Sequence, residues 1–177
     1  MAQRNEKNTL LIYSTTDGQT LSISTKISHV LAKKSNVDII SLDEASNQVL
    51  NDYDQIVIGA SIRYGKHKPE LYQFINRYKS TLESKKNGFF SVNVVARKQN
   101  KNSPETNPYM KKFVELSSWK PQILAVFAGK LNYPEYRFID KQMIRLIMFI
   151  TNGPTDTKKV FEFTDWDKVK QFALKFL

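Results

Sequence analysis

The feature that most constrains the fold of this chain is a series of short, nearly all-apolar runs separated by segments of helical periodicity. Each run is four or five residues long and rich in β-branched and aromatic side chains, and the runs occupy residues 9–13, 37–40, 56–60, 89–92 and 123–127. Such runs are typical of strands that are buried on both faces of a parallel sheet. The sequence therefore predicts a parallel sheet of five strands.

The segments between the runs carry apolar residues at steps of three and four, which is the spacing of one face of an α-helix. The pattern occurs at Ile23, Ile27, Val30 and Leu31; at Leu71, Phe74, Ile75 and Tyr78; at Tyr109, Phe113 and Leu116; and at Val169, Phe172, Ala173 and Phe176. Alternating strands and helices form right-handed βαβ units. The expected fold class is therefore α/β, with a doubly wound sheet covered by helices on both faces.

A long segment after the fifth run breaks this alternation. It covers about residues 129–159, contains the apolar stretch 143–150, and is followed by a further extended piece at 160–163. We interpret it as an insertion that interrupts the fifth strand, which then resumes. Loops of this length are usually functional. Because no linker or repeat divides the chain, we expect a single domain over residues 1–177.

Charge and composition limit the classes of function. The chain has 27 Lys and Arg against 17 Asp and Glu, a net charge of +10, which favours an anionic partner: nucleic acid, an acidic membrane or a polyanionic substrate. The absence of cysteine excludes disulfides, thiolate metal sites and cysteine nucleophiles. With only His29 and His67, no metal site is expected. The polar first residues and the lack of a long apolar run predict a cytoplasmic protein without a signal peptide or membrane span.

The first candidate site follows the first strand. Ligands of open parallel sheets bind beyond the carboxyl ends of the strands. Residues 14–20, Ser-Thr-Thr-Asp-Gly-Gln-Thr, lie at such an end and open a helix, where hydroxyls and free N–H groups bind anions. The segment lacks the glycine and lysine spacing of triphosphate and dinucleotide sites. It predicts a site for one terminal phosphate; the alternative is that Ser14 and Thr16 only cap the helix.

The ends of the third and fourth strands extend this site. Residues 61–65 and 91–97 each combine an aromatic or aliphatic wall with backbone polar groups, which suits a flat, amphipathic heterocycle held between two loops. A phosphorelay receiver domain has the same architecture but needs acidic residues at the first and third strand ends. Tyr13, Ser14 and Ser61 stand there instead, which excludes that class.

Several of these segments resemble the motifs of a known family. Tyr13–Thr20 resembles the phosphate-binding loop of flavodoxins, and the segments 58–65, 90–98, 133–137, 155–157 and 163–166 follow in the family's order. From about Leu10 to its end, the chain resembles the flavodoxin-like protoporphyrinogen IX dehydrogenases. The resemblance implies a flavodoxin-like fold and an FMN cofactor. It also implies oxidation of protoporphyrinogen IX to protoporphyrin IX in haem biosynthesis, a loss of six electrons and six protons, with electrons passed to menaquinone or another quinone.

The resemblance also assigns site residues by their place in these motifs. The loop for the FMN phosphate would be Ser14, Thr15, Thr16, Asp17, Gly18, Gln19 and Thr20. The residues flanking the isoalloxazine would be Ser61, Ile62, Arg63, Tyr64, Gly65, Phe89, Phe90, Ser91, Val92, Asn93 and Val94, with Tyr64 as the stacking ring, and Thr155, Asp156 and Thr157 would lie near the same edge. No side chain stands out as a catalytic acid or base, so the catalytic residues are not assigned.

A basic, aromatic span supports a tetrapyrrole substrate. Residues 97–145 hold ten Lys and Arg, four acids and seven aromatic residues. A tetrapyrrole with two propionates has a broad apolar face and two carboxylates, which such a span complements. The candidate substrate-binding residues are Arg63, Arg97, Lys98, Tyr133 and Arg137. The alternative is that the span is simply a solvated basic surface.

Residues 143–150 bear on location. This apolar stretch, flanked by Lys141 and Arg145, would either lie in the interface of an anionic membrane, as a peripheral protein of the cytoplasmic face does, or form a buried core helix.

Two rival functions stay open. A flavodoxin-type electron carrier would use the same FMN loops without oxidising porphyrinogen. Flavodoxin carriers are typically acidic, whereas this chain is basic. A nucleic-acid binder would need an exposed sheet face or a recognition helix, and a sheet covered on both faces offers neither, so no nucleic acid is expected.

Overall fold

The central sheet has five parallel strands. The computed structural model describes residues 7–177, apart from the side chains at 47 and 48. The strands are β1 (Lys7–Ser14), β2 (Ser35–Ser41), β3 (Gln55–Ser61), β4 (Lys86–Val92) and β5 (Ile123–Phe127), paired in the order β2-β1-β3-β4-β5. Each apolar run identified in the sequence lies in one of these strands. The predicted α/β fold with a five-stranded parallel sheet is confirmed.

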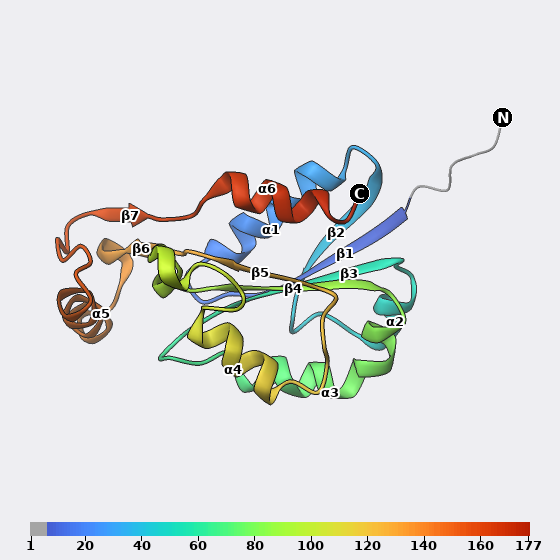
Figure 1. Cartoon of the computed structure of the whole chain (residues 1–177), viewed down its shortest axis with the longest axis horizontal. Helices are drawn as coiled ribbons and strands as arrows, with labels where there is room; N and C mark the ends of the chain where they lie inside the picture. Colours follow the sequence, from blue (N-terminus) through green and yellow to red (C-terminus); the bar gives the residue numbers. More distant parts are fainter. Residues whose placement is uncertain (1–6) are drawn as a thin grey trace.

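Helices cover both faces of the sheet, as predicted (Figure 1). One face carries α1 (Gln19–Leu31) and α6 (Trp166–Leu174); the other carries α2 (Asn47–Asn51), α3 (Pro69–Glu83) and α4 (Pro108–Leu116). The short helix α2 was not anticipated, because five residues are too few to show a helical period. Short 3₁₀ segments at Val94–Arg97 and Gln99–Lys101 follow β4.

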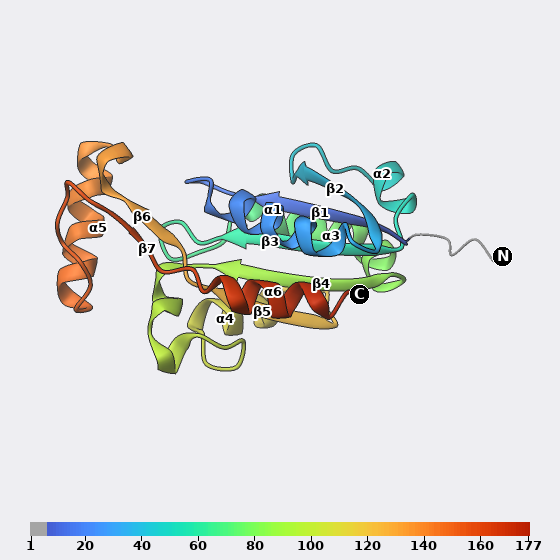
Figure 2. The ribbon, with the colours of Figure 1, turned by 90° about the horizontal axis from the view of Figure 1, so that it is seen from above.

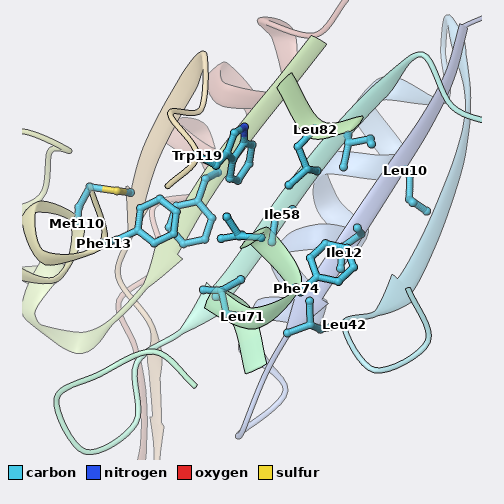
Figure 3. Close-up of a cluster of buried hydrophobic side chains, with 14 of the residues drawn as sticks. Leu10, Ile12, Leu42, Ile58, Leu71, Phe74, Leu82, Met110, Phe113 and Trp119 are labelled. Carbon is cyan, nitrogen blue, oxygen red and sulfur yellow. The ribbon is translucent and has the colours of Figure 1, made fainter. Parts of the chain in front are cut away.

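Alternate residues of the strands point to opposite faces and form two cores. Leu10, Ile12 and Ile58 face α3 and α4, where Phe113 and Trp119 complete a fully buried cluster (Figure 3). Their neighbours in the strands face α1 and α6. Both faces of the sheet are therefore shielded from water, which explains why the strand sequences are continuous apolar runs.

The insertion forms a separate hairpin and helix beyond β5. It contains β6 (Lys130–Asn132), a 3₁₀ turn at Tyr133–Glu135, α5 (Phe138–Ile150) and β7 (Val160–Glu162). The prediction that the fifth strand resumes in the sheet is wrong in this detail: β7 runs antiparallel to β6 in its own two-stranded sheet. The chain returns to the end of β5, since the Phe163 N–H donates to the Gly129 carbonyl at 3.1 Å, but its ladder partner is β6.

Helix α5 projects past the carboxyl ends of the strands (Figure 2). Met148 is its one buried residue, so the alternative of a buried core helix is wrong. We call its exposed apolar residues the α5 apolar surface: Phe138, Ile139, Met143, Leu146, Ile147, Phe149 and Ile150. Four of them expose 70% or more of their area. Within residues 7–177, no helix is both long and apolar enough to cross a membrane.

Candidate functional site

The loop between β1 and α1 is built to receive an anion. β1 ends at Ser14, and Gly18, with φ of 81°, turns the chain into α1. No side chain within the described residues caps this helix, and its first turn holds no acidic residue. The interpretation of Ser14 and Thr16 as caps is therefore wrong; Thr15 Oγ1 instead accepts from the Gly18 N–H at 3.0 Å. The uncapped end offers N–H donors and the positive end of the helix dipole.

A buried hydroxyl at the same helix end also lacks a partner. Thr20 is fully buried, and its Oγ1 has no hydrogen-bond partner among residues 7–177. An unsatisfied buried hydroxyl costs about 1–3 kcal/mol, so such a group in a native fold calls for an explanation. Together with the open space around Gly18, this hydroxyl fits the phosphate that the sequence motif predicts.

Gln19 has a different role from the one expected. Its side-chain amide donates to Thr164 Oγ1 at 2.9 Å and to Glu162 at 3.3 Å. Thr164 in turn donates to the Ala128 carbonyl. The Gln19 side chain thus ties the start of α1 to both ends of the insertion, and only its backbone stays available to an anion. Sequence reasoning missed this link because its partners lie more than 140 positions away.

Two loops face each other across an apolar cavity of about 450 Å³. Ile62–Gly65 follows β3 in a turn in which Tyr64 and Gly65 have positive φ, and Asn93–Val95 follows β4. The rest of the lining is Asp17, Tyr109, Lys130, Leu131, Tyr136, Asp140, Met143, Ile144, Ile147 and Met148. Loops predicted to sandwich a flat ring are therefore brought together, and the inner side of α5 closes the space.

A basic cavity of about 460 Å³ adjoins the apolar one. Its cationic side chains are Arg63, Lys66, Lys68 and Arg137. The two cavities share Arg63, Tyr64 and Asp140. Arg63 and Arg137, two of the predicted substrate-binding residues, thus line a space suited to carboxylates or phosphate.

Four side chains link the phosphate loop, the β3 loop and α5. Arg63 pairs with Asp17 at 3.4 Å and with Asp140 at 2.9 Å, and the Tyr64 hydroxyl donates to the other Asp140 oxygen at 2.7 Å. We call Asp17, Arg63, Tyr64 and Asp140 the Asp140 cluster. Burial raises the pKa of Asp17; Arg63 opposes the rise, whereas the carboxylates of Asp140 and Glu135 add to it. The arginine therefore lies between two crowded carboxylates.

A buried polar network joins the segments that carry the two loops of the apolar cavity. His67 Nε2 lies 3.1 Å from Ser91 Oγ, and Asn93 Nδ2 donates to the same hydroxyl at 3.4 Å. Asn107 Nδ2 donates to Asn93 Oδ1 at 3.1 Å, which joins the network to the start of α4. Burial lowers the pKa of His67 to about 4, so the ring is neutral near pH 7. Among residues 7–177, no group of three His, Asp or Glu is placed to hold a metal.

Several predicted site residues lie away from the cavities. Phe89 and Phe90 are core residues: Phe89 stacks on Phe113 at 3.8 Å, and Phe90 packs against Phe127 and Phe172. Ser61, Ser91 and Val92 line neither cavity. The Phe89 and Phe90 side chains point into the helix layers rather than past the strand end, as side chains of a strand buried on both faces do.

Six other candidates also lie outside the cavities. Tyr133 is fully buried, and its hydroxyl donates to the Pro154 carbonyl at 2.7 Å. Arg97 donates to the Thr151 hydroxyl at 2.8 Å and to its carbonyl at 3.0 Å. Tyr133 therefore holds the insertion together, and Arg97 ties its helix α5 to the segment after β4. Neither side chain lines either cavity, nor does Lys98. Thr155, Asp156 and Thr157 lie between α5 and β7, outside both cavities.

Comparison with known proteins defines the class. Residues 10–158 match the family described as the flavodoxin domain. The fold resembles oxidised flavodoxin 1 of Bacillus cereus, with a TM-score of 0.55 and 16% identity over 96% of both chains. Flavodoxin 2 of that organism has a TM-score of 0.54 and 20% identity over 96% of this chain and 97% of its own. These likenesses concern the fold, and with the matched family they define a flavodoxin-domain protein.

Curated relatives place the chain more narrowly. It is 42% identical to the protoporphyrinogen IX dehydrogenase (quinone) of Leishmania major, over 99% of this chain and 77% of that protein. It is also 42% identical to the protoporphyrinogen IX dehydrogenase (quinone) of Escherichia coli K12, over 93% of this chain and 92% of that protein. The chain therefore belongs to the family of flavodoxin-domain protoporphyrinogen IX dehydrogenases, and the family inferred from its motifs is confirmed.

Proposed function

We propose that the protein binds FMN and oxidises protoporphyrinogen IX to protoporphyrin IX, with the electrons passed to a quinone. The observation that carries the proposal is the 42% identity, over almost the whole chain, to relatives with that activity. The phosphate loop and the facing loops over the apolar cavity support it, since they offer the two halves of an FMN site side by side.

The chain's own residues would hold FMN at both ends. The phosphate would meet the N–H groups at the start of α1 and the free hydroxyl of Thr20. The ring would lie between Ile62–Gly65 and Asn93–Val95, with Tyr64 on its rim. Bound FMN supplies two-electron redox chemistry. The protein contributes position, exclusion of water by α5 and charge at the cavity wall.

No residue of the buried network is assigned as a catalytic proton acceptor. His67 lines the basic cavity, but it is neutral, almost fully buried and hydrogen-bonded to Ser91. Its role in the proposed reaction is to hold the two ring loops at a fixed separation. A loop displaced by about 1 Å can cost about 100-fold in rate, so a support of this kind affects catalysis without touching substrate.

We further propose that the protein binds peripherally to an anionic membrane through the α5 apolar surface, and that the quinone is menaquinone. Phe138, Ile139, Phe149 and Ile150 are largely exposed, and Lys141 and Arg145 lie on the same helix. Exposed apolar residues beside basic ones favour the interface of an acidic bilayer. The net charge of +10 has the matching sign. A membrane-bound protein would reach a lipid-soluble quinone directly.

The test is oxidation of protoporphyrinogen IX by the FMN-loaded protein under anaerobic conditions. With a menaquinone analogue present, we expect fluorescent porphyrin to form at a rate proportional to protein. No porphyrin, together with flavin reduction by an added reductase, would identify an electron carrier instead. A colourless protein that takes up no FMN would contradict the cofactor assignment itself.

A further inference from the structure

The Asp140 carboxylate is held in a manner suited to carboxylate recognition. Arg63 Nη2 contacts one of its oxygens at 2.9 Å, and the Tyr64 hydroxyl donates to the other at 2.7 Å. A guanidinium and a phenol thus hold one carboxylate from two sides. Paired donors of this kind, one of them charged, give both strength and geometric selectivity.

This carboxylate lies where two chemically different cavities meet. Asp140, Arg63 and Tyr64 line both the basic and the apolar cavity. Lys66 and Arg137, in the basic cavity, form no ion pair within residues 7–177. A ligand with an apolar face and a carboxylate edge would place that edge at this boundary, where Asp140 now stands.

The surroundings allow Asp140 to be exchanged for another carboxylate. Arg63 faces two carboxylates, and Asp17 would stay paired with it if Asp140 left. Asp140 belongs to the first turn of α5, whose one buried residue, Met148, packs in a small cluster with Leu131 and Tyr133 rather than in the main cores. No residue of α5 thus belongs to the two main cores between the sheet and its helices.

We propose that Asp140 occupies the binding position for a carboxylate of the tetrapyrrole substrate, and that the substrate carboxylate displaces it from Arg63 and Tyr64. Asp140 is then a specificity-determining residue. It competes with a ligand carboxylate for Arg63 and Tyr64, whereas a ligand without a carboxylate gains nothing from displacing it. This inference rests on the proposed function, since it concerns how the same site selects its substrate.

The experiment compares protoporphyrin IX, which has two carboxylates, with its neutral dimethyl ester. Both are titrated into the FMN-loaded wild type, Asp140→Asn and Glu115→Gln, and binding is followed by porphyrin absorbance at low salt. Glu115→Gln is the matched control, because Glu115 is an exposed carboxylate of α4 that lines neither cavity and forms none of the ion pairs found in residues 7–177. Flavin content is measured on every sample.

We expect Asp140→Asn to bind the dicarboxylate about three- to tenfold more tightly, because the ligand carboxylate no longer competes with the negative charge of Asp140. The affinity for the ester should stay within about twofold, because the ester carries no carboxylate. Arg63→Gln should abolish the preference for the dicarboxylate over the ester. Equal weakening of both ligands by Asp140→Asn would show a purely structural link, and unchanged binding of both would also overturn the proposal. A wild type that holds FMN but oxidises no porphyrinogen would instead refute the proposed function.

Discussion

Thr20 shows at the scale of one residue how a ligand can be inferred from an unpaired atom. Its buried hydroxyl has no partner among the described residues, yet it lies in the first turn of an uncapped helix. Ser24, one turn further along, also has a buried, unpartnered hydroxyl. The pair therefore allows a matched test, since Thr20 is the second residue of α1 and Ser24 lies one turn further from the helix end.

We expect Thr20→Val to weaken FMN binding by roughly 10- to 100-fold, the effect of one hydrogen bond to a charged group. The stability of the FMN-free protein should not fall, because the change removes an unsatisfied polar atom. Fluorescence titration of FMN and urea unfolding measure the two effects. Ser24→Ala should leave FMN affinity within about twofold, and an equal loss in both variants would contradict the phosphate assignment.

His67 makes the stability depend on pH. Burial depresses its pKa from 6.5 to about 4 in the folded state. Between these values the unfolded chain binds a proton and the folded chain does not, so the free energy of unfolding falls as the pH falls through this window. Below about pH 4 both states are protonated, and this contribution is fully lost.

For this histidine we expect a loss of about 2 kcal/mol in the free energy of unfolding between pH 7.5 and 5. His67→Gln should flatten the profile by that amount. His29→Gln, a change at an exposed histidine, should leave the profile as it is. Urea unfolding across the pH range measures the slopes, and parallel profiles for wild type and His67→Gln would contradict the burial of a neutral ring.

Gly59 tests the packing of the core beneath the site. A Cβ at this position in β3 would lie 2.1 Å from the Phe90 ring, which is fixed by Phe127 and Phe172. We expect Gly59→Ala to destabilise the protein by about 1–3 kcal/mol in urea unfolding, because the ring has nowhere to move. Gly129→Ala has only ordinary contacts, at 3.6 Å or more, and serves as control; equal stability of the two variants would contradict this packing.

At the scale of elements, the strands of the sheet could be predicted from the sequence, whereas the structure of the insertion could be predicted only in part. Each strand is buried on both faces and reads as an apolar run, so its place could be predicted. Residues 160–163 were correctly expected to be extended, but pairing between β7 and β6 depends on contacts across the insertion that no local pattern records. The apolar stretch at 143–150 has the same composition whether a helix is buried or exposed.

For the candidate site too, features that depend on a local motif could be predicted, and features that depend on distant partners could not. The phosphate loop was predicted because its function depends on a local motif, and the loops after β3 and β4 because a parallel sheet brings its carboxyl ends together. The roles of Gln19, Arg97 and Asp140 were missed or misassigned, because each depends on a partner far along the chain. The core position of the Phe89 side chain could not be read from the sequence, because an aromatic residue near a strand end can point to the core or to a ligand.

Helix α5 carries the proposed membrane contact, which can be tested by substitutions confined to this helix. We expect the double change Phe149→Glu and Ile150→Glu to weaken binding to anionic vesicles by about tenfold or more, since two largely exposed apolar side chains are lost. FMN binding should not change, because neither residue lines a cavity. Vesicle sedimentation measures the partitioning.

The control for this change is Leu174→Glu, which places the same charge on an exposed apolar residue of α6. It should leave vesicle binding unaffected. A second outcome is that both variants bind vesicles as the wild type does, and that only the α5 variant loses a dimer that the wild type forms in solution. The α5 apolar surface would then contact a second copy rather than lipid, which would contradict the membrane proposal.

At the scale of the whole molecule, charge and shape act together. The chain carries a net charge of +10, and the insertion projects from the sheet edge at which the cavities open (Figure 2). A membrane bound at α5 would thus lie next to the site. We expect vesicle binding to require anionic lipid and to weaken strongly between about 0.1 and 1 M salt, as the Debye length falls from about 10 to 3 Å. Binding independent of both would contradict the electrostatic part of the account.

The most direct measurement is the anaerobic reaction of an excess of FMN-loaded protein with protoporphyrinogen IX and no quinone. The proposed function requires the flavin absorbance to bleach as porphyrin fluorescence rises, in the ratio of three flavins reduced for each porphyrin formed, since six electrons leave in pairs. Addition of a menaquinone analogue should restore the oxidised flavin. A flavin that stays oxidised while the substrate is present would contradict the central claim.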